Sequence, residues 1–464
     1  MIKIDSIVHF FGTHGQLRKS QRTTLAALVW AVLYRPLLGV SKIGHHLAMA
    51  GGTSAKHAIK RVDRFLGNGR INMTVAQGDL ISRVLKGIRE ALITLDWTDP
   101  KDGIHQILSL NWRAHGRAIP LAWVTVRKDQ LKDHMRAIEI GLLKRVAGEW
   151  PRSCHPILVA DRGLGAIALF HALDALGWDW IIRGKGSTQV EVRPGVWLSL
   201  AALAAKKPVL RDLAPVRYGK SSGDQAYRCR IVIWAEPGYS DPWFLLVSRG
   251  LRKSRWPARL ITAAYGQRFT TEECFRDQKN DLYEGFQLDG VKLGTPERWD
   301  RLLLVFAWAY YWLNVGGWAM ERAKKDRDWK ANTVDRRTHA LWRLGVWGLQ
   351  HGDVVWRTLS RTQGDFGRRI PSLNRLFAEA MGVTLPEKPR RLGFSGFVSP
   401  LIHCHESRAL FPRTRISGMT WVAFVNPAPT GGRPRGSATR RGRSPRSRHS
   451  FDAKNSGPTT VNML

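Results

Sequence analysis

The order of apolar and amphipathic segments between residues 91 and 185 is the feature that most constrains the fold. Three short apolar runs come first, ALITLDWT, HQILSLNWR and AIPLAWVTV, and a turn at residues 114–117 joins the second to the third. A helical segment, the apolar run HPILVADRG, a second helical segment and a last apolar run, WDWIIRG, follow. An antiparallel meander that continues into βαβ units predicts an α/β fold with one mixed sheet and helices on its faces.

The rest of the chain separates into regions of different pattern. Helical periodicity dominates the residues before 91 and returns after 250, whereas short alternating strands and turn residues fill the segment between them that begins at 186. The end of the chain has few apolar residues and is rich in Arg, Gly, Ser and Pro, which predicts disorder. We therefore predict a helical N-terminal region, a first core segment, a β-rich insertion, a second core segment, a helical C-terminal region and a disordered basic tail, at residues 1–90, 91–185, 186–250, 251–330, 331–426 and 427–464.

The charge of the chain predicts the kind of partner. Lys and Arg number 73 against 37 Asp and Glu, which gives a formal net charge of +36. A charge this large attracts polyanions, with nucleic acid as the expected partner and an anionic membrane as the lesser one. Structural RNA-binding proteins share such a charge, so it predicts the partner and leaves the activity open.

The N-terminal region has a helix-turn-helix rhythm. The segments VSKIGHHLAMA and AKHAIKRVDRFL are joined by GGTS, whose glycines permit a turn and whose Thr53 or Ser54 can cap the second helix. Lys56, Lys60 and Arg64 share one face of that helix. We expect this face to contact DNA phosphates; the alternative is an ordinary solvated helix face.

Cysteine usage and hydropathy bear on the compartment. The four cysteines lie far apart without a CxxC pair, which favours reduced thiols in a cytosolic protein over a disulfide framework. The N-terminus lacks the apolar core of a signal peptide. Residues 302–320 reach the lower end of a membrane span, but Asn314 and the Gly316-Gly317 pair interrupt them and favour a buried core helix. We therefore expect a cytoplasmic, nucleoid-associated protein with no membrane partner.

Two of the strand-like runs end in an aspartate, Asp96 in ITLDWTD and Asp161 in ILVADRG. Acids at the carboxyl ends of strands lie where open α/β sheets bind ligands. Carboxylates gathered there repel one another unless cations neutralise them, and Mg²⁺ prefers oxygen ligands. Two such ions roughly 3.5–4 Å apart can activate an attacking oxygen and stabilise a leaving one at phosphorus. Asp99 is the rival for the first acid, but it precedes Pro100, where the strand must already be ending.

The segment YGQRFTTEECFRDQK, residues 265–279, supplies a third acid. On an uninterrupted α-helix, Tyr265, Arg268, Glu272 and Lys279 fall within an arc of about 60°. Such a face suits a metal-bound phosphate, with Glu272 on the metal, Arg268 and Lys279 on phosphate oxygens, and the Tyr265 hydroxyl on the same DNA backbone. The alternative is a solvated face with salt bridges such as Arg268–Glu272.

This segment resembles a known signature. The pattern Y-x2-R-x3-E-x6-K is similar to the signature of bacterial insertion-sequence transposases of the DDE class, in the IS-four superfamily. The companions of that signature match in order, since the family's D-x-T stands at 96–98, its D-R at 161–162 and its glutamate at Glu272. The β-rich segment 186–250 stands where that family has an insertion domain. The resemblance covers residues 90–325.

The resemblance implies a fold, a reaction and partners. The fold is ribonuclease-H-like, interrupted by the β domain, and Asp96, Asp161 and Glu272 hold two Mg²⁺ or Mn²⁺ ions. The reaction is cut-and-paste transposition: cleavage at the ends of an insertion sequence, a hairpin intermediate, and strand transfer. The partners are double-stranded DNA, as terminal inverted repeats and as target, and a second copy of the chain in a homodimer. The signature also implies that Trp243 stacks on a flipped base, the alternative being core packing.

Two other functions remain open. A ribonuclease-H-fold nuclease or resolvase would share the three acids but would not need Tyr265, Arg268 and Lys279 together. A non-catalytic nucleic-acid-binding protein would keep the acids only as structural groups.

Overall fold

The computed structural model divides the chain at residue 389, and the described residues all lie in the first of its two parts. The predicted basic tail, 427–464, and the predicted C-terminal region beyond residue 370 lie outside the described residues. The described residues are 4–12, 17–204, 209–220, 226–235, 241–280, 285–330, 333, 337–352 and 359–370.

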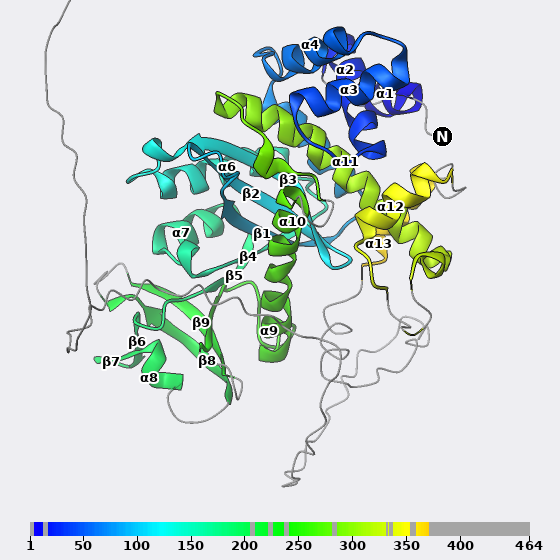
Figure 1. Cartoon of the computed structure of the whole chain (residues 1–464). Helices are drawn as coiled ribbons and strands as arrows, with labels where there is room; N and C mark the ends of the chain where they lie inside the picture. The colour runs from blue at the N-terminus through cyan, green and yellow to red at the C-terminus, as the bar shows by residue number, and fades with distance from the viewer. Residues whose placement is uncertain are drawn as a thin grey trace, which may run out of the picture. The chain divides into compact units, whose positions relative to one another are not determined.

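A mixed β-sheet forms the centre of this first part (Figure 1). Its strands run in the order β3-β2-β1-β4-β5-β10-β9-β8-β6-β7. Strands β1, β2 and β3 form an antiparallel meander, and β1 is parallel to β4, which is parallel to β5. The predicted mixed sheet of an α/β fold is therefore confirmed. The strands are β1 Glu90–Thr98, β2 His105–Ala114, β3 Arg117–Arg127, β4 His155–Ala160, β5 Asp179–Arg183, β6 Gln189–Arg193, β7 Val196–Ser199, β8 Val209–Tyr218, β9 Tyr227–Ala235 and β10 Trp243–Val247.

Helices surround the sheet and precede and follow it along the chain. Five of them come before β1 within the described ranges, as the helical pattern of the first region predicts. The helices are α1 Ile4–Gly12, α2 Lys19–Tyr34, α3 Val40–Gly51, α4 Ala55–Leu66, α5 Met73–Val84, α6 Met135–Glu149, α7 Ile167–Ala175, α8 Leu200–Ala204, α9 Ala258–Gly266, α10 Thr270–Lys279, α11 Pro296–Arg322, α12 Leu341–Gln350 and α13 Leu359–Arg368.

The strands of the predicted β-rich insertion extend the sheet of the core. Strand β10 pairs antiparallel with β5, and β9 pairs antiparallel with β10. Strands β8, β6 and β7 follow outward to the far edge. The segment is as rich in strands as its sequence predicts, but its backbone hydrogen bonds continue a sheet that the first core segment begins. The proposed domain boundaries themselves stay predictions.

Different helices cover the two faces of the sheet, and the alternating side chains of β4 identify the helices on each face. Ile157 and Val159 belong to a core cluster with residues of α9, whereas Leu158 and Ala160 belong to the larger cluster that includes α6 and α7. Because successive side chains of a strand point to opposite faces, α9 and α7 cover opposite faces of the sheet. The odd-numbered residues of β4 therefore face α9.

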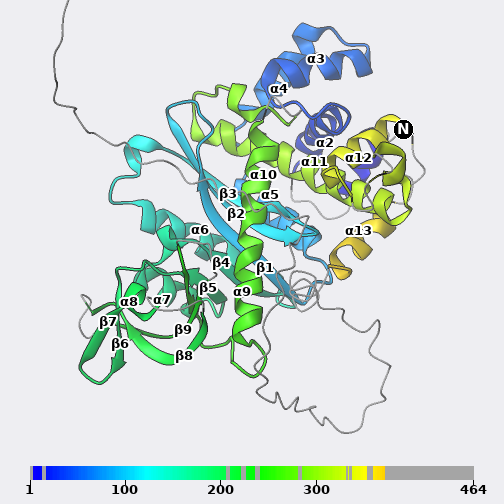
Figure 2. The same ribbon diagram turned by 60° about the horizontal axis from the view of Figure 1, so that its bottom comes forward.

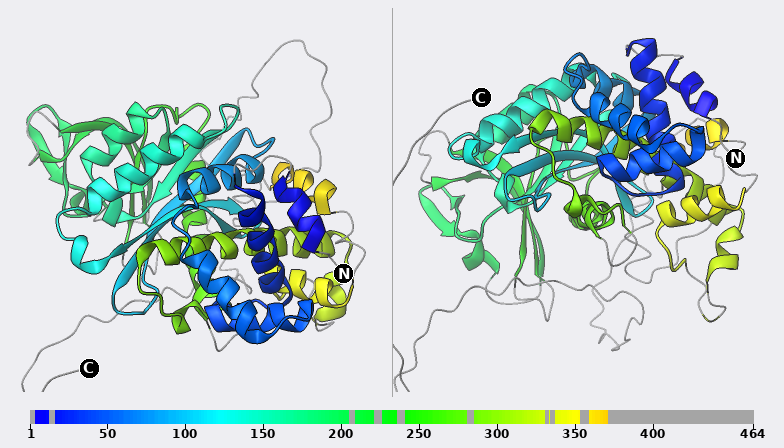
Figure 3. Two further views of the ribbon diagram at one scale, coloured as in Figure 1. Left: turned by 90° about the horizontal axis from the view of Figure 1, so that it is seen from above. Right: turned by 45° about the horizontal axis from the view of Figure 1, so that its top comes forward.

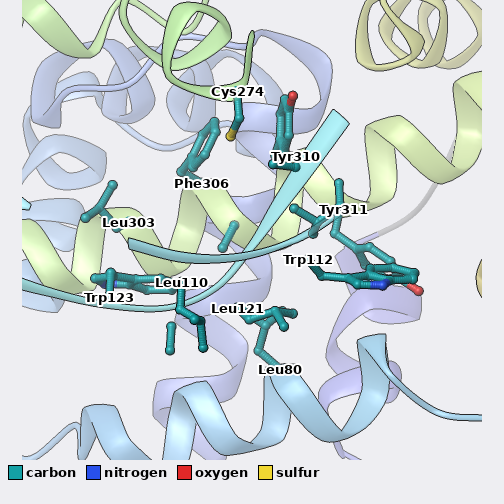
Figure 4. Close-up of a cluster of buried hydrophobic side chains, with 14 of the residues drawn as sticks. Leu80, Leu110, Trp112, Leu121, Trp123, Cys274, Leu303, Phe306, Tyr310 and Tyr311 are labelled. Carbon is teal, nitrogen blue, oxygen red and sulfur yellow. The ribbon is translucent and has the colours of Figure 1, made fainter. Parts of the chain in front are cut away.

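Helix α11 is the core helix that the apolar stretch 302–320 predicts. It is long and apolar enough to cross a membrane by length and composition, yet 94% of its apolar window is buried in the fold. Figure 4 shows why: Phe306 and Tyr310 of α11 pack with Cys274 on one side of the strands, and Leu80 of α5 lies on the other. The N-terminal helices lie beside α11 in both views of Figure 3, and Phe11 of α1 stacks on Trp312 with ring centroids 5.8 Å apart.

The turn between α3 and α4 forms as its sequence predicts. Gly52 adopts a left-handed conformation with φ 63°, which a residue without a Cβ tolerates best. Ser54 is the N-cap of α4, and its hydroxyl accepts a hydrogen bond from the His57 backbone N–H. The outer face of α4 is thereby presented in a fixed orientation.

Candidate active site

Asp96 and Asp161 lie side by side near the carboxyl ends of two parallel strands. Asp96 is two residues before the end of β1, and Asp161 directly follows β4. In the register of β1 and β4, Leu95 stands opposite Ala160, so the next residue of each strand is one of the two aspartates. Neighbouring strands are about 4.8 Å apart. Asp161 keeps extended backbone angles, so its side chain continues the alternation of β4 and faces α9 together with Val159. The sheet thus brings together two of the three predicted acids.

A column of helix crosses the sheet over these two acids (Figure 2). It consists of α9, a 3-10 turn over Gln267–Phe269, and α10. The predicted uninterrupted helix is therefore broken by a tighter turn, which changes the angular spacing of the signature residues. Tyr265 is 1% exposed, while the Glu272 side chain, after the turn, is 50% exposed. The signature residues consequently do not share one exposed face.

Arg268 joins the third acid to the first. Its guanidinium donates to Glu272 Oε1 at 2.8 Å and to Asp96 Oδ2 at 3.4 Å. The predicted Arg268–Glu272 salt bridge is present, but Arg268 itself is only 12% exposed and stacks over the Phe269 ring at 4.9 Å. A single buried cation therefore bridges two carboxylates that arrive from β1 and α10.

The electrostatics of Asp96 place all three acids in one neighbourhood. The pKa of the Asp96 carboxyl is raised to about 6, chiefly by burial; the Arg268 cation acts to lower it, and the nearby charges of Asp161 and Glu272 act to raise it. Like charges this close favour a cation between them. The Arg268 guanidinium, which donates to Asp96, supplies such a charge.

Lys279 is the last residue of α10, at the opposite end of the helix from Glu272. Burial lowers the pKa of its ammonium, whereas the carboxylates of Asp289, Asp99 and Asp96 act to raise it. Asp99, the rival first acid, is engaged elsewhere: its carboxylate accepts from the Lys101 backbone N–H at 2.7 Å and pairs with Lys128 at 2.6 Å. Asp96 is thus the better placed of the two.

Tyr265 and Trp243 pack against each other next to the acids. Their ring centroids are 4.7 Å apart at 69°, and Trp234 and Phe269 complete the aromatic group around Trp243. Burial raises the pKa of the Tyr265 phenol. This arrangement is the core packing that the sequence offers as the alternative for Trp243, and the DNA contacts assigned to Tyr265 and Trp243 stay predictions.

The predicted phosphate-contacting residues of α4 form an exposed cationic face, which we call the α4 basic face. The opposite side of the helix is buried and carries Ala58, Val62, Phe65 and Leu66. The members of the α4 basic face are Lys56, Lys60 and Arg64, each of them exposed.

The donor set suits a divalent cation in its chemistry. Asp96, Asp161 and Glu272 offer carboxylate oxygens, the ligands that Mg²⁺ and Mn²⁺ take, and Arg268 already stands where a positive charge is needed between two of them. With the side chains as they stand, no group of three or more His, Cys, Asp or Glu in the described ranges is arranged to hold a metal ion. Asp96, Asp161 and Glu272 are the residues that would hold an ion, and Glu272 would exchange its contact with Arg268 for a contact with that ion.

Sequence reasoning did not identify the residues that hold α10 in place. The Thr94 hydroxyl of β1 and the Thr271 hydroxyl of α10 share a hydrogen bond with 2.5 Å between the oxygens. At the other end of α10, Asp277 pairs with Arg117 at 3.1 Å and accepts from the Tyr310 hydroxyl at 2.7 Å. The only sequence signal for Thr94 is its place two residues before Asp96, on the same side of the strand.

No family model matches this chain, and no curated protein is significantly similar to it in sequence.

Proposed function

We propose that this chain is a metal-dependent DNA transposase of the DDE class, acting on the ends of an insertion sequence. The observation that carries the proposal is the meeting of three acids from distant parts of the chain. Asp96 and Asp161 lie near the carboxyl ends of adjacent parallel strands, and Glu272 of α10 is joined to Asp96 through the Arg268 bridge. Such convergence at the carboxyl edge of a sheet is typical of a ligand site.

The fold around the acids supports a ribonuclease-H-like core. The antiparallel meander β1-β2-β3, followed by the parallel strands β4 and β5, is the arrangement expected for it from the sequence. The strands of 186–250 are inserted between the second and third acids, as the transposase resemblance implies. We assign residues 91–185 and 251–330 to this core.

The chain's own residues have separate roles in the proposed reaction. The three carboxylates would hold two Mg²⁺ or Mn²⁺ ions, which would supply charge neutralisation and activation of the attacking oxygen at a DNA phosphodiester. Arg268 balances the carboxylates before substrate arrives and then binds a phosphate oxygen of the DNA backbone. Lys279 donates to a neighbouring phosphate oxygen. The buried setting of Asp96 and Arg268 strengthens these interactions relative to water.

The partners in the proposal follow from charge. A net charge of +36 and the α4 basic face suit the phosphate backbone of double-stranded DNA, both as terminal inverted repeats and as target. Two ends must be joined in one event, which calls for two copies of the chain as a homodimer in the DNA complex. A nucleoid-associated place in the cytoplasm follows from such substrates.

The decisive experiment measures cleavage and joining separately. A duplex that carries the terminal repeat flanking the coding sequence, with a labelled 3′ end, is incubated with plasmid target and Mg²⁺. We expect 3′-end cleavage and transfer of the label to the plasmid, and we expect Asp161→Asn to abolish both while DNA binding persists. Asp99→Asn is the matched control and should retain activity, because the Asp99 carboxylate is held by the Lys101 backbone N–H and by Lys128.

The rival functions give different results in the same assay. Cleavage without transfer of label would identify a nuclease or resolvase on the same core. Binding of DNA that is neither cut by the wild type nor changed by Asp161→Asn would identify a non-catalytic nucleic-acid-binding protein.

A further inference from the structure

A hydrogen bond between Thr94 and Thr271 lies on the buried side of α10. Both residues are fully buried, and their hydroxyl oxygens are 2.5 Å apart. The two residues are separated by 177 positions in the sequence, so the bond ties the central strand β1 to the helix that carries the third acid. Neither hydroxyl can exchange this partner for water while the residues stay buried.

Each threonine is a close neighbour of one acid. Thr94 and Asp96 are two residues apart in β1 and therefore point to the same face of the sheet. Thr271 immediately precedes Glu272 in α10. A shift of α10 along or away from β1 would first break the threonine bond and would move the Glu272 carboxylate by a similar distance relative to Asp96.

The other anchors of the column hold different points. Arg113 of β2 donates to the Gln267 side chain at 2.9 Å, which fixes the 3-10 turn before α10. Arg117 and Tyr310 hold Asp277 near the end of α10. Among the hydrogen bonds and ion pairs of the described residues, the threonine pair is the one that ties α10 to the strand bearing Asp96 through buried side chains.

We propose that Thr94 and Thr271 are positioning residues, whose shared hydrogen bond sets the separation of Glu272 from Asp96 and Asp161 and so the affinity of the three acids for a divalent cation. This inference rests on the proposed function, because it needs the acids to bind a metal ion. Groups that orient metal ligands without touching the ion typically contribute 10- to 100-fold to metal affinity, and we expect about tenfold here.

The test measures Mn²⁺ affinity of the full-length protein from the electron paramagnetic resonance signal of free Mn²⁺, beside the thermal unfolding midpoint. The Thr271→Val variant keeps the branched shape and loses the hydroxyl, leaving the Thr94 hydroxyl without its partner. We expect it to bind Mn²⁺ about tenfold more weakly and to be less stable. Thr271→Ser keeps a hydroxyl and should restore the affinity to near the wild-type value.

The Thr94→Val/Thr271→Val double variant separates positioning from stability. Replacing both partners by apolar groups of the same shape is close to neutral for stability. We expect a thermal midpoint near that of the wild type and an Mn²⁺ affinity that stays about tenfold lower. A double variant that binds Mn²⁺ as tightly as the wild type would show that the hydroxyl pair is structural only, and the inference would be overturned.

Two further variants complete the design. Thr262→Val removes a buried hydroxyl of α9 that bonds only within its own helix, to the Ala258 carbonyl oxygen at 3.0 Å, and its Mn²⁺ affinity should not change. Asp161→Asn tests the premise. If Asp161→Asn weakens Mn²⁺ binding and the threonine variants do not, the inference fails alone. If Asp161→Asn leaves Mn²⁺ binding unchanged, the proposed metal site and the inference fail together.

Discussion

Arg268→Ala tests how the three acids are balanced before any metal ion binds. The guanidinium lies 2.8 Å from Glu272 Oε1 and 3.4 Å from Asp96 Oδ2. Two unit charges 4 Å apart interact by about 4 kcal/mol at an effective dielectric constant of 20. The Glu272 side chain is 50% exposed, so solvent screens its attraction to Arg268. Most of the remaining interaction energy therefore comes from the less exposed Asp96. We expect a net loss of about 1–2 kcal/mol of stability in the metal-free protein.

The same substitution should strengthen metal binding. A cation that enters between the carboxylates must displace or face the Arg268 charge in the wild type, and it meets no such charge in the variant. We expect Mn²⁺ affinity to rise about fivefold to thirtyfold. This factor is the expected loss of stability, about 1–2 kcal/mol, converted into a ratio of equilibrium constants. DNA binding should weaken, because a phosphate contact is lost.

The assay is an Mn²⁺ titration followed by the same resonance signal, combined with chemical denaturation of metal-free protein. Arg276→Ala is the matched control: Arg276 lies on α10, which follows the turn that carries Arg268, its side chain is 58% exposed, and it pairs with Glu273 at 3.1 Å. We expect Arg276→Ala to change stability by less than about 1 kcal/mol and to leave Mn²⁺ affinity unchanged. Weaker Mn²⁺ binding by Arg268→Ala would refute the view that this arginine occupies the position of a cation among the acids.

Three further predictions concern other parts of the fold. Gly345→Ala should destabilise the protein by about 1–3 kcal/mol or more, measured as a lower thermal midpoint, because its Cβ would lie 2.1 Å from a carbonyl oxygen of α11, whereas Gly148→Ala, with open space around it, should be neutral or slightly stabilising. Burial raises the pKa of Asp300 to about 7, above the value near 3.9 of the unfolded chain, so the stability contributed by its protonated form is fully present below about pH 4 and is lost as the pH rises through about 7. In the wild type, the free energy of unfolding measured by denaturation should fall by up to about 4 kcal/mol between pH 4 and pH 8 through this group, and Asp300→Asn should remove that fall. Equal pH profiles for the two proteins would contradict the assignment. Replacing the α4 basic face by glutamine should lower the slope of log K against log salt for DNA binding by about 2–3, and an unchanged slope would remove these residues from the DNA contact.

The sequence alone was sufficient for the parts of the fold that depend on local pattern. The runs that contain Asp96 and Asp161 form strands because alternation and β-branched residues specify them. Asp161 directly follows β4 as predicted, whereas β1 continues two residues past Asp96, to Thr98. The turn at Gly52 and the cap at Ser54 also follow from local chemistry. The sequence could likewise predict a buried α11, since its apolar residues surround the whole helix.

The sequence did not predict the features that depend on distant contacts. An α-helical period places Tyr265 on one face with Glu272, but packing against Trp243 and the 3-10 turn at Gln267 bury the tyrosine instead. The strands of 186–250 look self-contained in sequence, yet β10 pairs with β5. The unpaired N–H and C=O groups along the edge of a strand can form hydrogen bonds with another strand, whatever its place in the sequence.

The sequence by itself determined which residues are acidic, where two strands end, and that a third acid lies on a helix with basic neighbours. Tertiary structure alone decided that these acids come together, because the parallel register of β1 and β4 sets Asp96 beside Asp161 and the buried Thr94–Thr271 bond ties α10 to β1. Register and helix placement arise from hydrogen bonds and packing between residues far apart in the chain, and no local pattern encodes those distances.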